Sequence, residues 1–339
     1  MRPWREAWAD ALYGPGGFYT RGEAPGDHFR TSVHASALYA GAVLELLARV
    51  DAALGHPDPL DLVDVGAGRG ELLTAAAGRF GGRLRRWAVE VGPLDLPGVG
   101  VVPDVAELPR VTGLMVANEW LDDVPLDVVE LTAAGPRVVL VDRTGAESLG
   151  DPPGGVDAAW LRRWWPLAEV GDRAEVGRTR DDAWAGAVDR VRRGVAVAVD
   201  YGHESGGRPP GGTLTGYRGG AQVPPVPDGS CDLTAHVALD AVAAAGVGAG
   251  AGETRLDTQR AALSGLGVTG RRPPIELARS DPPAYLAALA RAGEAAELTA
   301  TAGLGGFGWL VQGVGVRVPF PPAATRARVR RAPAPRRTE

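Results

Sequence analysis

The sequence predicts an α/β fold built on a doubly wound, mostly parallel sheet. Three observations support this prediction. Short apolar runs, typical of strands buried on both faces, lie at 60–65, 87–91, 99–104, 111–118 and 193–202. Segments with helical periodicity separate several of these runs. A glycine-rich turn, GAGRG (66–70), joins the first run directly to a helix. Sheets of this kind bind ligands at the carboxyl ends of their strands, where we expect the functional site.

The remaining segments are assigned around this sheet. Residues 1–55 are predicted to form a helical and loop segment over the cleft, with helices at 3–13 and 33–54. We assign 56–125 and 186–318 to the sheet domain, with a helix at 232–246 and a last strand at 306–316. An inserted cap is expected at 126–185, with a hairpin (128–131, 137–141) and a tryptophan-rich helix (158–170) that packs it on the sheet. Residues 319–339 read as a disordered Pro/Arg tail.

Composition narrows the class of protein. The chain has 339 residues, 45% hydrophobic and 23% charged, which is ordinary for a globular protein. Its single cysteine argues against a disulfide framework or a cysteine-rich zinc site, and no metal site is predicted. The net charge of −5 argues against nucleic acid as a partner. With no signal peptide and no apolar span of membrane length, the expected compartment is the cytoplasm. The oligomeric state stays open, a homodimer being one option.

The turn DVGAGRG (64–70) carries the first functional signal. Its small residues allow a ligand to approach the backbone, and the following helix offers N–H donors. A dinucleotide fingerprint requires G-x-G-x-x-G, but here the third glycine, Gly70, comes one residue early. A phosphate-binding P-loop requires a lysine, and the chain has none. Ligands held through phosphates are therefore disfavoured.

The form D-x-G-x-G-x-G resembles motif I of class I methyltransferases, which bind S-adenosylmethionine (SAM). This resemblance assigns Asp64, Gly66, Gly68 and Gly70 to cofactor binding. Glu90 follows at the end of the second strand, where a carboxylate can accept both hydroxyls of a ribose. Asp104, after the third strand, is placed to contact the adenine amino group.

More of the chain resembles the MidA family of SAM-dependent methyltransferases, which have a Rossmann-like sheet. That family includes the mitochondrial assembly factor that dimethylates an arginine of a complex I subunit. The resemblance therefore implies methyl transfer to a nitrogen of a protein, an arginine. The motifs that carry it are LYGPGGFY (12–19), GDHFRTS (26–32), DVGAGRG (64–70), VEVGP (89–93), NEWLDDVP (118–125), VDYG (199–202), GTLTGY (212–217), DLTAHV (232–237) and TQ (258–259).

The chain departs from this family at two motif positions, and its region 126–190 has little motif content. His28 adds a residue between Asp27 and Phe29, and Asp123 stands where the family usually has a small residue. Both departures concern the acceptor substrate more than the cofactor.

The end of the fourth strand supplies the principal catalytic candidates. Asn118 is the only asparagine in a chain whose composition indicates a GC-rich coding bias, and its amide can both donate and accept. The competing interpretation is a helix cap. Glu119 can hold a cationic acceptor or be a helix-start charge. Asp122 is balanced between the two interpretations, and Asp123 is predicted to lie on a solvated face.

Further candidates follow the fifth strand. Tyr201, after Asp200, is either aromatic lining or core. His236 lies at the predicted start of the helix at 232–246, and the family resemblance favours its facing the cleft. Asp232 is a plausible N-cap of that helix, as Thr31 and Ser32 are for the helix at 33–54.

Three functions remain open from the sequence: a protein arginine methyltransferase, a methyltransferase for a small molecule under the tryptophan-rich cap, and a SAM-binding assembly factor with little catalysis. A nucleic-acid methyltransferase is disfavoured, because the chain is acidic and lacks an N-P-P-Y-like motif.

Overall fold

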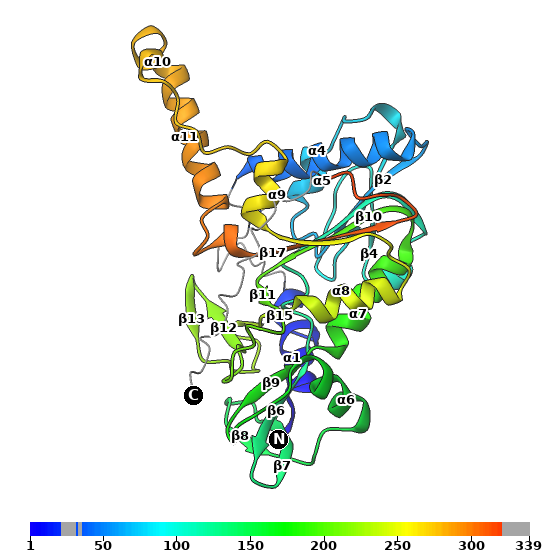
Figure 1. Ribbon diagram of the computed structural model, residues 1–339, viewed down its shortest axis with the longest axis vertical. Helices are drawn as coiled ribbons and strands as arrows, with labels where there is room; N and C mark the ends of the chain where they lie inside the picture. The colour runs from blue at the N-terminus through cyan, green and yellow to red at the C-terminus, as the bar shows by residue number, and fades with distance from the viewer. Residues whose placement is uncertain (22–31, 33–35, 321–339) are drawn as a thin grey trace, which may run out of the picture.

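The computed structural model describes residues 1–21, 32 and 36–320. A seven-stranded sheet dominates it, with the order β16-β17-β10-β5-β2-β3-β4 (Figure 1). The strands from β4 to β10 in this order run parallel, whereas β17 is antiparallel to both β10 and β16. The mostly parallel sheet is thus confirmed. Its strands are β2 (Leu60–Val65), β3 (Leu84–Val89), β4 (Val99–Val102), β5 (Val111–Asn118), β10 (Val191–Asp200), β16 (Thr254–Thr258) and β17 (Gly308–Val314).

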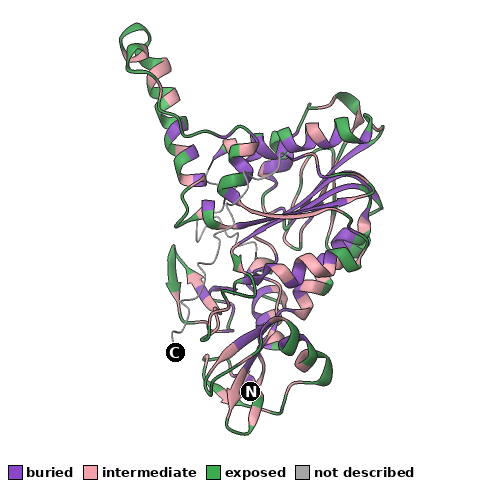
Figure 2. Ribbon diagram, in the orientation of Figure 1, coloured by how far each residue is buried: buried purple, intermediate pink, exposed green. Residues whose placement is uncertain are grey.

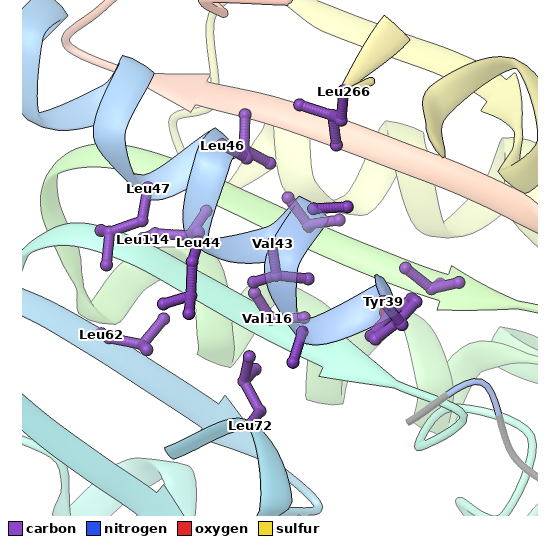
Figure 3. Close-up of a cluster of buried hydrophobic side chains, with 14 of the residues drawn as sticks. Tyr39, Val43, Leu44, Leu46, Leu47, Leu62, Leu72, Leu114, Val116 and Leu266 are labelled. Atoms are coloured by element: carbon purple, nitrogen blue, oxygen red, sulfur yellow. The ribbon is translucent and has the colours of Figure 1, made fainter. Parts of the chain in front are cut away.

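The central strands are mostly apolar because both of their faces are covered. Helices α4 (Ala37–Leu54), α5 (Glu71–Ala75) and α9 (Gln259–Gly265) lie on one face, and α7 (Arg178–Arg190) and α8 (Leu239–Gly248) lie on the other (Figure 1). Leu62 and Leu114 point toward α4, as Figure 3 shows, while their chain neighbours Val63 and Met115 join the cluster beneath α7 and α8. This alternation buries the whole middle of the sheet (Figure 2).

Helix α4 begins later than the sequence predicts. Ser36 is its N-cap, with its side chain accepting the Leu38 N–H at 2.9 Å, and Gly55 ends it in the left-handed region at φ 79°. Ser32 contacts other residues instead of capping the helix, as described below. The other expected cap, Thr31, and most of the GDHFRTS motif lie outside the described residues.

The order of the strands fixes where a ligand can bind. From β2 the chain moves outward through β3 and β4, then returns to add β5 and β10 on the opposite side of β2. The switch point therefore lies between β2 and β5, and a crevice opens there at the carboxyl ends of the strands.

The inserted region forms a second sheet together with the N-terminus. This sheet has the order β1-β7-β6-β9, with β8 pairing with β7. The predicted hairpin is present, and α1 packs on this sheet through Trp8 and Leu12. Trp160 and Trp165 are buried against Val129, a packing role. The elements are β1 (Arg2–Pro3), α1 (Trp4–Tyr13), β6 (Asp127–Thr132), β7 (Gly135–Val141), β8 (Glu147–Leu149), α6 (Gly155–Trp164) and β9 (Arg173–Val176).

The predicted helix at 232–246 is wrong over its first seven residues, 232–238. Residues there form β14 (Asp232–Thr234) and β15 (Val237–Ala238), and α8 starts only at Leu239. Strand β14 pairs with β12 (Thr215–Arg218), which also pairs with β13 (Ala221–Val223), and β15 pairs with β11 (Gly202–His203). Asp232 is fully buried and caps no helix.

The last described segments complete the outline. Helices α10 (Ile275–Ser280) and α11 (Pro282–Leu298) form a hairpin that projects from the body (Figure 1). Short 3-10 turns are η1 (Tyr19–Arg21), η2 (Gly81–Arg83), η3 (Val105–Glu107) and η4 (Leu304–Gly306).

The predicted C-terminal tail begins too early at 319, because Phe320 is 7% exposed and packs in the core. Residues 321–339 lie outside the described part. Within that part, no helix has the length and apolar character needed to cross a membrane.

Candidate active site

A cavity of about 580 Å³ lies at the switch point. The loops after β2, β3, β4 and β5 all contribute to its wall, as do the N-terminal segment and α7. Its volume is within the usual range of small-molecule sites. Among the residues that line it are Tyr13, Tyr19, Asp64, Gly66, Gly68, Glu90, Asp104, Asn118, Glu119, Trp120, Asp123 and Asp182.

The three glycines of the turn after β2 share a left-handed backbone but have different surroundings. Their φ values are 71°, 55° and 77° for Gly66, Gly68 and Gly70, which favours glycine at each position. A Cβ on Gly68 would meet nothing within 4 Å, and Gly68 lines the cavity, so the space beside it is free for a ligand. A Cβ on Gly70 would lie 2.1 Å from Leu96 Cδ1, and Gly70 does not line the cavity. Close packing therefore explains Gly70.

Glu90, just after β3, connects this turn to the next loop. Its Oε2 accepts the Gly68 N–H at 2.7 Å, and its Oε1 accepts the Gly92 N–H at 2.8 Å. Burial raises the pKa of Glu90, and the two N–H donors partly offset that rise. The geometry brings a carboxylate to the cavity wall beside the open space at Gly68, as the sequence predicts for a residue that binds a ribose.

The other two predicted cofactor carboxylates also reach the cavity. Asp104 caps η3, with Oδ1 accepting the Ala106 N–H at 2.7 Å, and remains exposed. Asp64 is buried at the end of β2. Its pKa is raised well above the usual value by burial and by repulsion from Glu71 and Glu90.

The end of β5 is held by a chain of hydrogen bonds. Asn118 Oδ1 accepts the Tyr39 hydroxyl at 2.6 Å, and Asn118 Nδ2 donates to Glu119 Oε1 at 3.0 Å. The same Glu119 oxygen accepts the Ser32 N–H at 2.9 Å, and the Ser32 hydroxyl donates to Gln259 Oε1 at 3.1 Å. The sequence does not identify Tyr39 as a site residue, because Tyr39 occupies an apolar position of α4. The cap interpretations of Asn118 and Ser32 do not account for these bonds.

Glu119 combines two unusual properties. Its φ of 50° is in the left-handed region, which is unfavourable for a side chain larger than glycine and recurs at functional sites. Burial raises its pKa to about 7, against the lowering effect of the Ser32 N–H, and repulsion from Asp122 adds to the rise. A carboxyl group at the cavity wall therefore changes charge near neutral pH.

The remaining catalytic candidates form a cluster that does not line this cavity. Asp122 is 1% exposed, and its Oδ2 accepts the hydroxyls of Thr234, at 2.7 Å, and Tyr201. The Tyr201 ring meets His236 edge-on, with 5.2 Å between ring centroids. His236 lies in a loop and is exposed overall, while partial burial of its ring lowers its pKa. The structure thus brings Asp122, Tyr201 and His236 together beside the residues that line the cavity. Their catalytic roles stay predictions.

The expectation for Asp123 is wrong: it does not lie on a solvated face. It is 6% exposed and lines the cavity, because the N-terminal segment covers it. The Tyr19 hydroxyl bonds to Asp123 Oδ2 and lies 3.0 Å from Asp232 Oδ1. Burial and repulsion from Asp122 and Asp232 raise the pKa of Asp123 well above its usual value. The Tyr19 hydroxyl can donate its proton to only one of these two carboxylates at a time. The close approach of Asp123 and Asp232 therefore favours a further proton shared between their carboxyl groups.

Comparison with known proteins indicates the chemistry of the chain. Residues 99–255 match the family described as "Putative S-adenosyl-L-methionine-dependent methyltransferase". A COG1565 superfamily member from Burkholderia thailandensis, solved with bound S-adenosyl-homocysteine, is 25% identical; the alignment covers 93% of this chain and 88% of that one, with a TM-score of 0.74. The chain is a SAM-dependent methyltransferase.

A second structure agrees with this result. The native structure of an uncharacterized COG1565 superfamily protein from the same organism is 26% identical over 95% of this methyltransferase and 90% of its own chain, with a TM-score of 0.75. No curated protein matches the chain. The sequence-based expectations of an α/β methyltransferase fold and of SAM as cofactor are therefore confirmed, whereas the MidA assignment and the acceptor are matters of proposal.

Glu90 supplies a direct test of the cofactor site. We expect Glu90→Ala to weaken SAM binding by about 1–3 kcal/mol, because a polar group of the ligand loses its buried partner. Calorimetry with SAM and its demethylated product measures the change. Glu107→Ala, an exposed glutamate at the end of η3, is the control and should bind SAM normally. Unchanged affinity in Glu90→Ala would remove Glu90 from the cofactor site.

Proposed function

We propose that this methyltransferase acts on a basic nitrogen, and that the nitrogen belongs to an arginine of a protein, as the MidA resemblance implies. The observation that carries the proposal is Glu119: a half-buried carboxyl group on the cavity wall, with a pKa of about 7 and with Asn118 fixed beside it. A neutral oxygen or carbon acceptor can also use a base, but only a cationic nitrogen in addition needs a negative charge to hold it.

The cavity residues fit the cofactor. Gly68 leaves open space, and the Glu90 carboxylate and Asp104 border it, which suits an adenosine with its ribose hydroxyls. Bound SAM supplies a methyl group on a positively charged sulfur, which makes the displacement easy. The work left to the protein is to position the acceptor, exclude water and remove a proton.

A guanidinium makes the strongest demand on the protein. Its pKa lies above about 12, so a carboxylate must hold the cation and take a proton as the new N–C bond forms. We assign both tasks to Glu119. Asn118, whose amide is oriented by Tyr39, positions the acceptor or the methionine end of the cofactor. We infer that His236, the exposed member of its cluster, contacts the acceptor further out, and that Asp122 positions Tyr201 beside it.

We also propose that the N-terminal segment and the 126–185 insertion act together as a cap. The supporting contacts are the packing of α1 on the inserted sheet and the presence of Tyr13 and Tyr19 in the cavity wall. This cover favours the second candidate function, methylation of a small molecule that fits beside the cofactor.

Incubation with labelled SAM and whole-cell lysate separates these functions. Label in one or a few proteins, found on arginine by mass spectrometry, supports the first proposal. Label in the small-molecule fraction supports the second. If SAM binds and no fraction takes label, both proposals fail, and binding without catalysis is the better account.

The pH dependence of catalysis tests the role of Glu119. Below pH 7 its carboxyl is protonated and cannot accept a proton, so we expect kcat/KM to rise with pH through about 7 and then level off. The profile of Glu119→Gln should lack that rise. A rise of the same size and midpoint in the variant would assign the titration to another group.

A further inference from the structure

A second cavity, of about 260 Å³, lies between the inserted sheet and the loop at 211–214. It shares no lining residue with the cofactor cavity. Glu147 of β8, Arg173 and Glu175 of β9, and Thr213 and Gln222 are part of its wall. Its volume is below that of drug-sized sites, so it suits a small group rather than a nucleotide.

Glu175 is the unusual residue of this cavity. It is 2% exposed, and its Oε1 accepts the N–H groups of Thr213 and, at 3.1 Å, Leu214. Its Oε2 is also buried and has no hydrogen-bond partner among the residues that the structure describes. A buried carboxylate oxygen without a partner is costly, so a positive charge held in the neighbouring cavity would stabilise the ionised form of Glu175.

The charges around the cavity indicate the sign of that ligand. Arg173 is the cation of the wall, but its guanidinium is bonded to Glu130 and Glu147, at 2.9 and 2.8 Å. Glu147 also accepts the Trp4 indole N–H at 2.8 Å. Arg180, which is buried and does not line the cavity, also attracts the charge of Glu175. The three carboxylates Glu130, Glu147 and Glu175 still outnumber the two arginines. Burial raises the pKa of Glu175, which a bound cation would lower again.

We propose that this cavity binds an organic cation, an ammonium or guanidinium group, held by the negative charge of Glu175 together with that of Glu147. Two sources share this chemistry: a free small amine or guanidine, and a basic side chain of a protein that docks on the inserted sheet. The proposal does not depend on the identity of the methyl acceptor.

The test uses the full chain saturated with S-adenosylhomocysteine, so that the cofactor cavity is filled. Agmatine, ethylguanidine and ethylammonium are titrated by calorimetry. We expect saturable binding that tightens as the pH is raised, and at least about a tenfold loss in Glu175→Gln. The glutamine keeps an oxygen for the loop N–H groups while it replaces the free carboxylate oxygen with a donor. Glu107→Gln is the matched control and should bind like the unmodified protein.

A second variant distinguishes a loss of binding from a loss of folding in Glu175→Gln. Gln222 is exposed and lines the cavity, so Gln222→Arg places a positive charge at its edge and should also weaken binding by tenfold or more. An arginine-containing peptide that competes with agmatine indicates a protein side chain as the source, and one that does not compete indicates a free cation. If none of the three probes binds saturably, or if Glu175→Gln binds them as well as the unmodified chain does, the proposal is overturned and the cavity holds water.

Discussion

Replacing Gly68 with valine is expected to weaken SAM binding by at least about 100-fold, which is about 2.7 kcal/mol, while the protein stays folded. A Cβ at Gly68 meets no protein atom within 4 Å, so the new side chain has room in the empty protein. That room is part of the cavity, and the valine would occupy space that the cofactor needs. Calorimetry with SAM measures the loss, and thermal unfolding measures the fold.

The matched control for this substitution is Gly78→Val. Gly78 also has a left-handed backbone, at φ 71°, and a Cβ there also meets nothing within 4 Å. It is exposed and does not line the cavity. Both variants therefore carry similar backbone strain, on the order of 1–2 kcal/mol, and only Gly68→Val should lose SAM. Equal SAM affinity in the two variants would refute the position of the cofactor.

The sheet was predictable because its signals are local. The runs at 60–65 and 111–118 coincide with β2 and β5, since each is mostly apolar, buried on both faces and bounded by polar or turn residues. Motif spacing likewise placed Asp64, Glu90 and Asp104 at the ends of successive strands, and parallel strands bring their carboxyl ends to one edge. Those residues do line one cavity.

The features that could not be predicted from the sequence depend on contacts between residues that lie far apart in the chain. DLTAHVALDAVAAAG looks helical throughout, but its first residues pair with β12, and no local pattern reveals that partner. Asp123 is buried because Tyr19, 104 positions away, bonds to it. Tyr39 looks like one more apolar residue of α4 until the fold brings its hydroxyl to Asn118. Glu175 gave no signal at all, since its cavity forms only when β9 meets the loop at 211–214.

The second large effect is expected at Glu119. Glu119→Gln keeps the shape of the side chain and an oxygen for the Ser32 and Asn118 donors, but it cannot accept a proton. Turnover on the identified acceptor should fall by roughly 10²–10⁴-fold, the usual range for the loss of an acid–base partner. SAM affinity should hardly change, because the charge that is removed serves the acceptor.

The stability of Glu119→Gln and a control variant at Asp182 provide two further checks on this prediction. The pKa of Glu119 is raised in the folded protein, so its ionised form is less favourable there than in the unfolded chain; at pH 8 Glu119→Gln should therefore be at least as stable as the unmodified protein. Asp182→Asn removes a different carboxylate of the same cavity, an exposed one on α7 that pairs with Arg178, and should leave turnover within a few-fold. If Glu119→Gln behaves like Asp182→Asn, the charge at Glu119 belongs to the structure of the β5 end, and another base must serve the acceptor.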